Sequence, residues 1–230
     1  MKINTLLIAN RGEIACRIAR TARAQGITPV GVHSEADANA LHVREIGRSI
    51  LIGAGPASES YLRIDAVLDA ARQVGADAIH PGYGFLAENP DFANAVEAAG
   101  MIFVGPTAET LDRFGDKASA KDAAIAAGVP VVSGASGAKS DPAEIAAAVR
   151  EMGFPVLLKA VGGGGGRGQR LVETENTLVQ DIEGALREAK STFGSEGMLL
   201  ERFLPAARHV EVQIAGDGAG HVVHLFERDC

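Results

Sequence analysis

Residues 5–32 read TLLIANRGEIACRIARTARAQGITPVGV, and this stretch decides the fold class. It begins with Thr5–Ala9, a continuous apolar run that is typical of a strand buried on both faces. Apolar side chains then recur at helical spacing over residues 14–22, and Gly26 marks the end of that helix. Val30–Val32 predicts a second strand. A strand, a helix and a strand with short connections form the unit from which parallel sheets are built.

The same alternation continues to about residue 114. The further predicted elements are three strands, at Ser49–Ile52, Asp77–His80 and Met101–Val104, and two helices, at Tyr61–Val74 and Phe92–Ala99. This order predicts an α/β domain with a doubly wound parallel sheet, covered by helices on both faces. We therefore assign residues 1–114 to an amino-terminal domain of this class.

The pattern changes after a helix at Asp116–Ala127, for which Asp116 is a good N-cap. A turn-rich stretch, Ser133–Gly137, marks the next boundary. A small α+β unit follows, with helices at Pro142–Met152 and Asn176–Lys190 and strands at Pro155–Ala160, Gln169–Val172 and Met198–Glu201. The last element is a hairpin of strands at 209–214 and 221–227. We expect four parts, at residues 1–114, 115–132, 133–203 and 204–230.

Composition limits the class of protein. The 230 residues are 47% hydrophobic and 22% charged, which is typical of a globular chain. The 22 Lys and Arg against 29 Asp and Glu give a formal charge of −7, which argues against a protein that coats nucleic acid or an anionic membrane. Two cysteines, Cys16 and Cys230, provide no disulfide framework, and Leu6–Ala9 is too short an apolar run for a signal peptide or a membrane span. We expect a soluble, cytoplasmic protein.

The strongest motif is Lys159–Gly168, in which five consecutive glycines, Gly162–Gly166, lie between two predicted strands. Ordering glycine costs backbone entropy, and glycine runs by themselves usually indicate a flexible linker. Linkers do not normally separate two apolar strands by only a few residues. The context therefore favours a hairpin whose backbone N–H groups fold over an anion such as a triphosphate. It is not a Walker loop, because the chain contains no G-x-x-x-x-G-K-[ST] sequence.

Two lysines support a phosphate site. Lys159 lies in an otherwise apolar strand, where an unpaired ammonium is costly to bury, although a solvent-facing lysine on an edge strand is a common alternative. Lys117 falls in the first turn of the helix that Asp116 begins, where the helix dipole disfavours a cation. A bound anion would compensate for both. Lys117 alone would indicate nothing, since lysines at helix starts are not rare.

Three other features leave alternatives open. Glu201 ends a predicted strand and is either a site residue or an exposed strand end. His209, Glu211 and Gln213 share one strand face, which either lines a site or faces water. The segment His80–Asn89 follows the carboxyl end of a strand, where open α/β sheets bind ligands, although its proline and glycines also fit an ordinary turn. No metal-ligand spacing and no serine or cysteine nucleophile stand out.

These motifs resemble those of biotin carboxylase, the ATP-grasp component of acetyl-CoA, propionyl-CoA, methylcrotonyl-CoA and pyruvate carboxylases. The resemblance runs through the whole chain in order, and its long motifs are specific for this family over other ATP-grasp ligases. It is carried by Ala9–Ala15, His80–Asn89, Gly115–Lys117, Pro155–Ala160, Gly162–Gly168, Arg208–Gln213 and Glu227–Cys230.

The resemblance implies a reaction and a nucleotide site. The family uses MgATP to activate bicarbonate as carboxyphosphate, and then carboxylates N1′ of carrier-bound biotin. The positions matched to ATP are Lys117, Lys159 and His209 for the phosphates, Gly164, Gly165 and Gly166 for a lid loop over them, and Glu201, Arg202, Phe203 and Leu204 for the adenine. The adenine contacts would be made largely by the main chain, which should tolerate Arg202 where the family usually has lysine.

The resemblance also implies a biotin site and partners. Tyr83 and Gly84 would lie near biotin, and the helix that carries Arg17 and Arg20 resembles the family's dimer surface, so a homodimer is expected. Further partners would be a biotin carboxyl carrier protein or domain and a carboxyltransferase subunit or domain. In the family's terms, residues 133–203 are the ATP-grasp lid and residues 204–230 the first hairpin of the ATP-grasp body.

The family's magnesium-binding carboxylates, bicarbonate-binding arginine and lysine, and catalytic base lie further along than Cys230. The chain also stops at Asp229–Cys230 without a helix, a cap or a polar tail. We therefore expect an incomplete enzyme with no catalytic or metal-binding residue among these positions, which neither hydrolyses ATP in a biotin-dependent manner nor binds nucleotide tightly. The final carboxyl acceptor would be set by another domain or subunit.

Three other functions are considered. Carbamoyl-phosphate synthetase or a purine-pathway ligase has the same lid but lacks the His80–Asn89 sequence. A dinucleotide-binding oxidoreductase fits the early strand–helix–strand pattern, but Asn10–Glu13 lies where its G-x-G-x-x-G sequence would be. A non-catalytic interaction module is the third, because the terminal hairpin without a neighbouring sheet would expose an edge and an apolar face.

Overall fold

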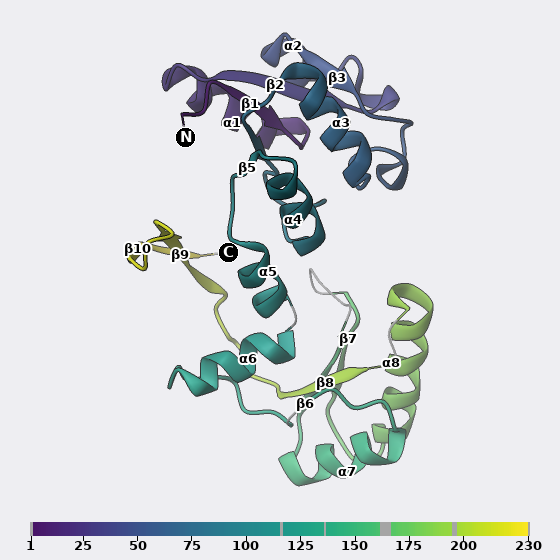
Figure 1. The fold of residues 1–230 in the computed structure, drawn as a ribbon. Helices are drawn as coiled ribbons and strands as arrows, with labels where there is room; N and C mark the ends of the chain where they lie inside the picture. The colour runs from purple at the N-terminus through teal and green to yellow at the C-terminus, as the bar shows by residue number, and fades with distance from the viewer. Residues whose placement is uncertain (1, 116, 136, 162–166, 195–196, 230) are drawn as a thin grey trace. The chain divides into compact units, whose positions relative to one another are not determined.

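The computed structural model describes residues 2–115, 117–135, 137–161, 167–194 and 197–229. The chain divides into two compact units, Met1–Ala123 and Ala124–Cys230. Figure 1 labels the helices and strands of both units. Within the described residues, none of the helices is long and apolar enough to cross a membrane.

The first unit is built on a parallel sheet of five strands in the order β3-β2-β1-β4-β5. The strands are β1 (Thr5–Ile8), β2 (Thr28–His33), β3 (Ser49–Leu51), β4 (Ala78–His80) and β5 (Ile102–Phe103). The order reverses between β1 and β4, as in a doubly wound sheet. The fold class predicted from residues 5–32 is confirmed.

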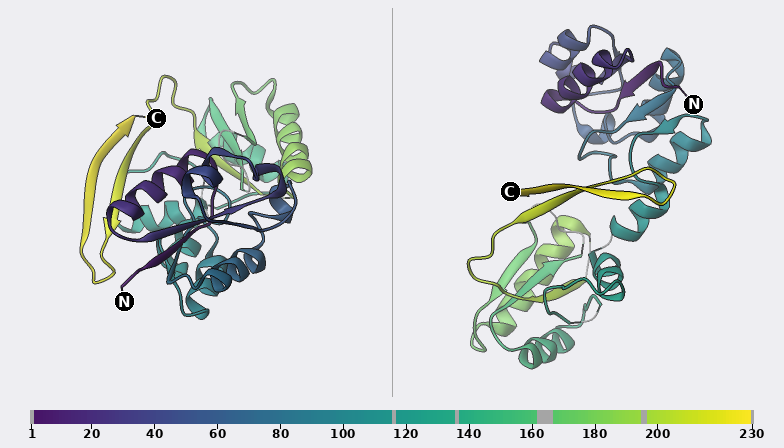
Figure 2. Two further views of the ribbon diagram at one scale, coloured as in Figure 1. Left: turned by 90° about the horizontal axis from the view of Figure 1, so that it is seen from above. Right: turned by 90° about the vertical axis from the view of Figure 1, so that its left-hand side faces the viewer.

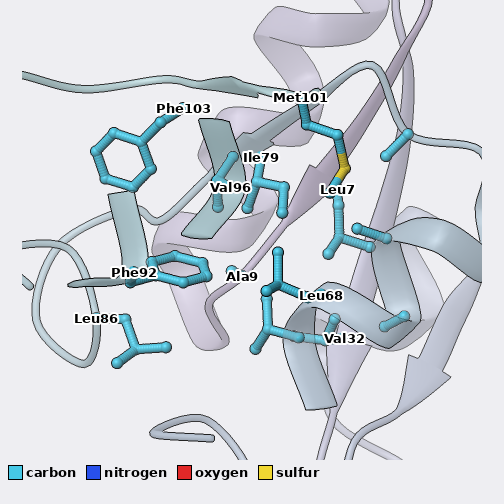
Figure 3. Close-up of a cluster of buried hydrophobic side chains, with 14 of the residues drawn as sticks. Leu7, Ala9, Val32, Leu68, Ile79, Leu86, Phe92, Val96, Met101 and Phe103 are labelled. Carbon is cyan, nitrogen blue, oxygen red and sulfur yellow. The ribbon is translucent and has the colours of Figure 1, made fainter. Parts of the chain in front are cut away.

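Helices cover both faces of this sheet. They are α1 (Gly12–Ala24), α2 (Leu41–Ile46), α3 (Ile64–Val74) and α4 (Pro90–Ala98). The helix α5 (Ala108–Gly115) packs against α4, and α6 (Lys117–Ala126) follows it in the chain. Because side chains alternate along a strand, Leu7 of β1 points into one core and Leu6 and Ile8 into the other. Figure 3 shows the core that contains Leu7, where Phe92 and Phe103 meet edge to face with ring centroids 5.8 Å apart.

The second unit contains an antiparallel sheet of three strands in the order β7-β6-β8. Its strands are β6 (Val156–Ala160), β7 (Gln169–Val172) and β8 (Met198–Arg202), and its helices are α7 (Pro142–Met152) and α8 (Leu178–Phe193). Val156, Leu158 and Ala160 of β6 are buried in the same core as residues of α7 and α8, and Figure 1 shows both helices beside this sheet. The intervening positions of β6 are only half-buried.

The last two strands, β9 (Val210–Gly216) and β10 (Val222–Asp229), form an antiparallel hairpin with a register shift between His224 and Glu227. Figure 2 shows it as a two-stranded ribbon. Its apolar side chains are exposed, up to 75% for Phe226. The predicted exposure of an apolar hairpin face is therefore confirmed.

The structure contains elements that the sequence reasoning did not predict. These are α2, α5 and two short 3-10 helices at Glu35–Asp37 and Ala57–Glu59. The predicted helix at 61–74 begins only at Ile64, because Tyr61 lies in a turn and is buried. The helix predicted at 116–127 is present as α6, but Asp116, its proposed N-cap, lies outside the described residues.

The turn-rich boundary predicted at Ser133–Gly137 contains one residue that pairs with the edge strand β8, and a second pairing residue follows it. Gly134 forms an isolated antiparallel bridge with Glu201, and Lys139 forms one with Met198. These residues therefore extend the small sheet. The division of the chain into four parts stays a prediction.

Candidate functional site

The first candidate site lies where the strand order reverses, at the carboxyl ends of β1 and β4. Open α/β sheets bind ligands at this position. Asn10 lies just after β1, and the loop Pro81–Phe85 follows β4. The strands β1 and β4 are hydrogen-bonded neighbours. The topology thus brings these two segments together, as the sequence pattern predicts.

Asn10 joins the two segments. Its side chain is 3% exposed, and its Nδ2 donates to the carbonyl oxygens of Pro81 at 2.7 Å and Tyr83 at 2.8 Å. Its Oδ1 accepts from the Arg11 amide at 2.9 Å. Gly82 packs against this amide so closely that a Cβ there would lie 2.7 Å from Asn10 Nδ2, and its φ of +68° also favours glycine. The loop backbone is therefore held by a buried side chain.

Tyr83 lines a cavity of about 460 Å³. The cavity is lined by apolar residues of α1 and by His80, Gly82 and Tyr83. The Tyr83 side chain is largely exposed, and its hydroxyl donates to the carboxylate of Glu13. This hydrogen bond is the main cause that raises the pKa of Tyr83 above 10.0. Burial lowers the pKa of His80, and its Nδ1 accepts from the Gly82 amide at 3.0 Å, so we expect a neutral imidazole at pH 7.

A second polar network surrounds Asp37, which follows β2. The Asp37 carboxylate accepts from Tyr61 at 2.7 Å, Ser34 Oγ at 3.0 Å and Arg11 at 3.0 Å. Burial by itself would raise the pKa of Asp37, but these hydrogen bonds outweigh it and the pKa is lowered. Burial and the hydrogen bond to Asp37 raise the pKa of Tyr61 to about 12. Arg11 also lies over the stacked rings of Tyr61 and Phe85, 5.2 and 5.4 Å from their centroids.

Both networks argue against a dinucleotide site. A dinucleotide fold needs a bare glycine turn after β1 for the pyrophosphate and an acidic residue after β2 for the ribose hydroxyl. Here Asn10 occupies the crevice after β1, and Asp37 is already bonded to three protein donors. The described crevice therefore offers neither feature.

The second candidate site lies on the open face of the three-stranded sheet. Leu157 faces Glu201 and Lys159 faces Leu199 in the register of β6 and β8, so Lys159 and Glu201 are diagonal neighbours on one face. The Lys159 ammonium is ion-paired with Glu201, and both side chains are partly buried, at 25% and 21% exposed. Because β6 is the central strand, the interpretation of Lys159 as an edge-strand lysine is wrong.

The glycine-rich segment connects two paired strands. Lys159 faces Gln169 in the antiparallel register of β6 and β7, and the Ala160 amide donates to the Gly168 carbonyl at 2.8 Å. The predicted strand–loop–strand hairpin is confirmed. Gly164, Gly165 and Gly166, predicted to cover phosphates, lie outside the described residues.

The other predicted nucleotide residues are placed as follows. Arg202 ends β8, and the amide of Phe203 donates to the Pro155 carbonyl at 3.1 Å. The Leu204 side chain is 50% exposed, and His209 is exposed immediately before β9. Lys117 is the first residue of α6 and belongs to the first unit, whereas Lys159 belongs to the second. The predicted convergence of these two amines on one anion therefore stays a prediction.

Sequence reasoning missed the pairings at both sites. The motif Asn10–Glu13 indicates the absence of the glycine pattern and contributes to the family resemblance, but it predicts neither the Asn10 bridge nor the Glu13–Tyr83 contact. The Asn10 bridge could have been suspected from the sequence, because an asparagine directly follows the apolar run Thr5–Ala9. The Lys159–Glu201 pair was also missed, because the strand register that joins residues 42 positions apart is not readable from local spacing. Among the described residues, no group of three or more His, Cys, Asp or Glu side chains could hold a metal ion.

Comparison with known proteins agrees with these two units. Residues 2–111 match the family described as "Biotin carboxylase, N-terminal domain", and residues 116–230 match "Carbamoyl-phosphate synthase L chain, ATP binding domain". The biotin carboxylase of Pseudomonas aeruginosa is 51% identical over 99% of this chain and 51% of its own length. The methylcrotonoyl-CoA carboxylase subunit alpha, mitochondrial, of Dictyostelium discoideum is 49% identical over 99% of this chain and 33% of its own.

Among solved structures, the biotin carboxylase domain dimer of Hydrogenobacter thermophilus 2-oxoglutarate carboxylase, in complex with MgADP, ADP and bicarbonate, matches with a TM-score of 0.94. It is 44% identical, over 100% of this chain and 51% of that chain. The chain thus spans about a third to a half of the length of these relatives.

The doubly wound unit, followed by a small sheet with a glycine-rich hairpin, defines a protein with the ATP-grasp architecture. Its amino-terminal match is to a biotin carboxylase domain, whereas the name carbamoyl-phosphate synthase occurs only in the description of its ATP-binding match. The chain belongs to the biotin carboxylase family, and the resemblance inferred from its motifs is confirmed.

Proposed function

We propose that this chain supplies the nucleotide-binding lid and the biotin-facing domain of a biotin carboxylase. The reaction would be the MgATP-dependent activation of bicarbonate to carboxyphosphate, followed by carboxylation of carrier-bound biotin. The enzyme would thus be an ATP-dependent ligase. The relatives of the family and the bound MgADP and bicarbonate of the Hydrogenobacter domain support this proposal.

The observation that carries the proposal is the partly buried Lys159–Glu201 pair beside the glycine hairpin. The Lys159 ammonium lies on a central strand and is ion-paired with the Glu201 carboxylate. A triphosphate would offer Lys159 several charge-assisted acceptors at once. We propose that phosphate replaces Glu201 as the partner of Lys159, which leaves Glu201 at the adenine end of the site.

The other nucleotide contacts are proposed from the family resemblance. Lys117 and His209 would also contact phosphates, Gly164–Gly166 would cover them, and Arg202–Leu204 would hold the adenine through the main chain. The Phe203 amide already donates to the Pro155 carbonyl, so the base would use other backbone groups of this segment. Magnesium would arrive with the nucleotide, and its protein ligands would lie outside the described residues.

Tyr83 and Gly84 are proposed to face biotin, at the loop that the buried Asn10 holds. The partners would be a biotin carboxyl carrier protein or domain, a carboxyltransferase subunit or domain, and a second copy of the chain. The dimer of the Hydrogenobacter domain supports the last of these. A cytoplasmic location is our proposal, although the Dictyostelium relative is named as mitochondrial.

The test is a titration of the chain with MgATP, followed by amide chemical shifts. We expect weak, saturable shifts in β6–β8, and we expect Lys159→Gln to weaken the apparent affinity about tenfold or more, since a charged hydrogen bond contributes about 1.5–3 kcal/mol. Lys190→Gln, at an exposed position of α8, is the matched control and should change little. Equal weakening by both substitutions, or shifts confined to the first unit, would contradict the proposed site.

Two further measurements separate the alternatives. NADH should produce no saturable shifts at the carboxyl ends of β1 and β4, and such shifts would favour a dinucleotide-binding domain. We also expect no bicarbonate-dependent ATPase activity from the 230-residue chain with free biotin. Substantial turnover would show that these residues are catalytically sufficient, against our expectation.

A further inference from the structure

The exposed ring of Tyr83 is held by a side chain from another segment. The side chain is 61% exposed, so packing constrains it little. Its neighbours Gly82 and Gly84 both have positive φ angles, +68° and +67°, so Tyr83 lies between two left-handed glycines at a bend of the chain. A ring in such a position would sample several rotamers unless its hydroxyl were bonded.

We propose that Glu13 is a positioning residue for Tyr83, which fixes the phenol ring in the lining of the cavity beside α1. That the ring is held there for biotin rests on the proposed function. The positioning itself rests on the geometry of the described residues.

The segment Asn10–Glu13 contacts both the backbone and the side chain of Tyr83. Asn10 binds the backbone, through the Tyr83 carbonyl at 2.8 Å, and Glu13, three residues later, binds the hydroxyl at the far end of the same residue. With both ends of Tyr83 fixed from the start of α1, the direction of the ring is determined. His80 and Gly82 line the same cavity, so the ring forms one wall of a defined recess.

The electrostatics favour the same arrangement. Glu13 lies in the first turn of α1, where the helix dipole stabilises a carboxylate, and the N-cap residue Arg11 makes no side-chain capping bond. An ionised carboxylate accepts a phenol hydrogen bond strongly and disfavours the phenolate. The raised pKa of Tyr83 follows from this contact, so the phenol stays protonated and remains a donor throughout the neutral range.

The alternative is that Glu13 only stabilises α1 through its favourable interaction with the helix dipole. This purely structural role predicts a loss of helix stability when Glu13 is replaced but no change at Tyr83. The two roles therefore differ in the titration and the mobility of the Tyr83 ring. These readouts need no nucleotide, no biotin and no turnover.

The test is a spectrophotometric titration of tyrosinate. The chain contains only Tyr61 and Tyr83 and no tryptophan, so the difference between the parent chain and Tyr83→Phe isolates the phenol of Tyr83. We expect its midpoint to lie above 10.0 in the parent chain, and to fall toward that value in Glu13→Gln, which removes the charge but keeps a similar shape. Glu109→Gln, in the first turn of α5, is the matched control and should leave the midpoint unchanged.

A second measurement reads the position of the ring directly. We expect 13C relaxation of the Tyr83 ring to show restricted motion in the parent chain and faster motion in Glu13→Gln and Glu13→Ala. A Tyr83 midpoint that is ordinary in the parent chain, or that Glu13→Gln does not move, would overturn the proposal, as would an equally restricted ring in Glu13→Ala. Failure of the MgATP titration would refute the proposed function while leaving this result intact, so the two can be told apart.

Discussion

Replacing Asn10 tests the bridge that joins the carboxyl ends of β1 and β4. Asn10→Ala removes two bonds donated to the Pro81 and Tyr83 carbonyls and one accepted from Arg11. A buried hydrogen bond contributes about 0.5–1.5 kcal/mol net, and a buried carbonyl left without a donor costs more. We expect the first unit to lose about 2–3 kcal/mol of its free energy of unfolding.

Asn10→Asp sharpens the test because it keeps the acceptor and the shape. At neutral pH the introduced carboxylate would face two carbonyl oxygens, so we expect a loss at least about 1 kcal/mol larger than in Asn10→Ala. Burial and the two carbonyls would raise the folded pKa of the introduced group above its unfolded value near 3.9. The folded state then binds more protons than the unfolded state, so the deficit relative to the parent chain should shrink as pH falls from 7 toward 4.

Urea unfolding followed by tyrosine fluorescence measures this loss. Both tyrosines, Tyr61 and Tyr83, lie in the first unit, so the signal reports that unit. With a slope of about 1–2 kcal/mol per molar, the midpoint should fall by about 1–3 M in Asn10→Ala. Asn94→Asp, at an exposed position of α4, adds the same charge and should shift it little. A change of less than about 0.5 kcal/mol in both Asn10 variants, or equal losses for Ala and Asp at pH 7 and pH 4, would refute the reasoning.

Three other predictions follow from described contacts. The pKa of Tyr61 is about 12 in the folded state, against an ordinary value of 10.0. Because the folded state therefore keeps this proton to higher pH, the first unit should lose about 2–3 kcal/mol of its free energy of unfolding between pH 10 and pH 12. Tyr61→Phe should flatten that part of the pH profile, and an unchanged slope would contradict the assignment. A double-mutant cycle of Lys159→Met and Glu201→Gln, read by hydrogen exchange in β6 and β8, should give a coupling of about 1 kcal/mol that decreases with salt, whereas additive losses would show that the pair contributes nothing. Val212→Thr with Ile214→Thr, which reduces the exposed apolar surface of β9, should lower concentration-dependent association in sedimentation velocity; equal association would place the contact elsewhere.

The fold was readable from the sequence where local signals and packing agree. Thr5–Ile8 is apolar throughout because its strand is buried on both faces, and α7 begins and ends at Pro142 and Met152 as predicted, with Asp141 capping it through the Ala143 amide at 2.7 Å. The helix α5 also carried a readable signal, since Thr107 accepts from the Thr110 amide at 3.2 Å as an N-cap does. That signal was overlooked.

The helix α2 could not be predicted in the same way. It has six residues and no side-chain N-cap. Its carboxyl end is completed from a distance, because Arg23 of α1 donates to the Glu45 carbonyl at 2.8 Å and the Ile46 carbonyl at 3.0 Å. His42 adds a buried contact to the Val32 carbonyl at 3.2 Å. Such long-range partners exist only after the sheet has assembled.

In the candidate site too, single residues can be recognised from the sequence but their distant partners cannot. Lys159 is visible in the sequence as a charge in an apolar strand, and the loop after β4 as polar and aromatic residues that follow a strand end. Their partners, Glu201 and Glu13, lie 42 and 70 positions away in the chain. Only strand register and the order of the sheet bring them into contact, so sequence spacing could identify the groups but not the pairs.

The Asn10 side chain fills the space at the carboxyl ends of β1 and β4, and this limits which cofactors the domain could be changed to bind. A glycine in place of Asn10 would make room for a pyrophosphate but would leave the Pro81 carbonyl without its donor. Releasing Asp37 to bind a ribose would leave Tyr61 and Arg11 without their acceptor. Each single step toward a redox-cofactor domain therefore passes through a less stable intermediate. Two domains can therefore share a topology and still be interconverted only by several substitutions made together.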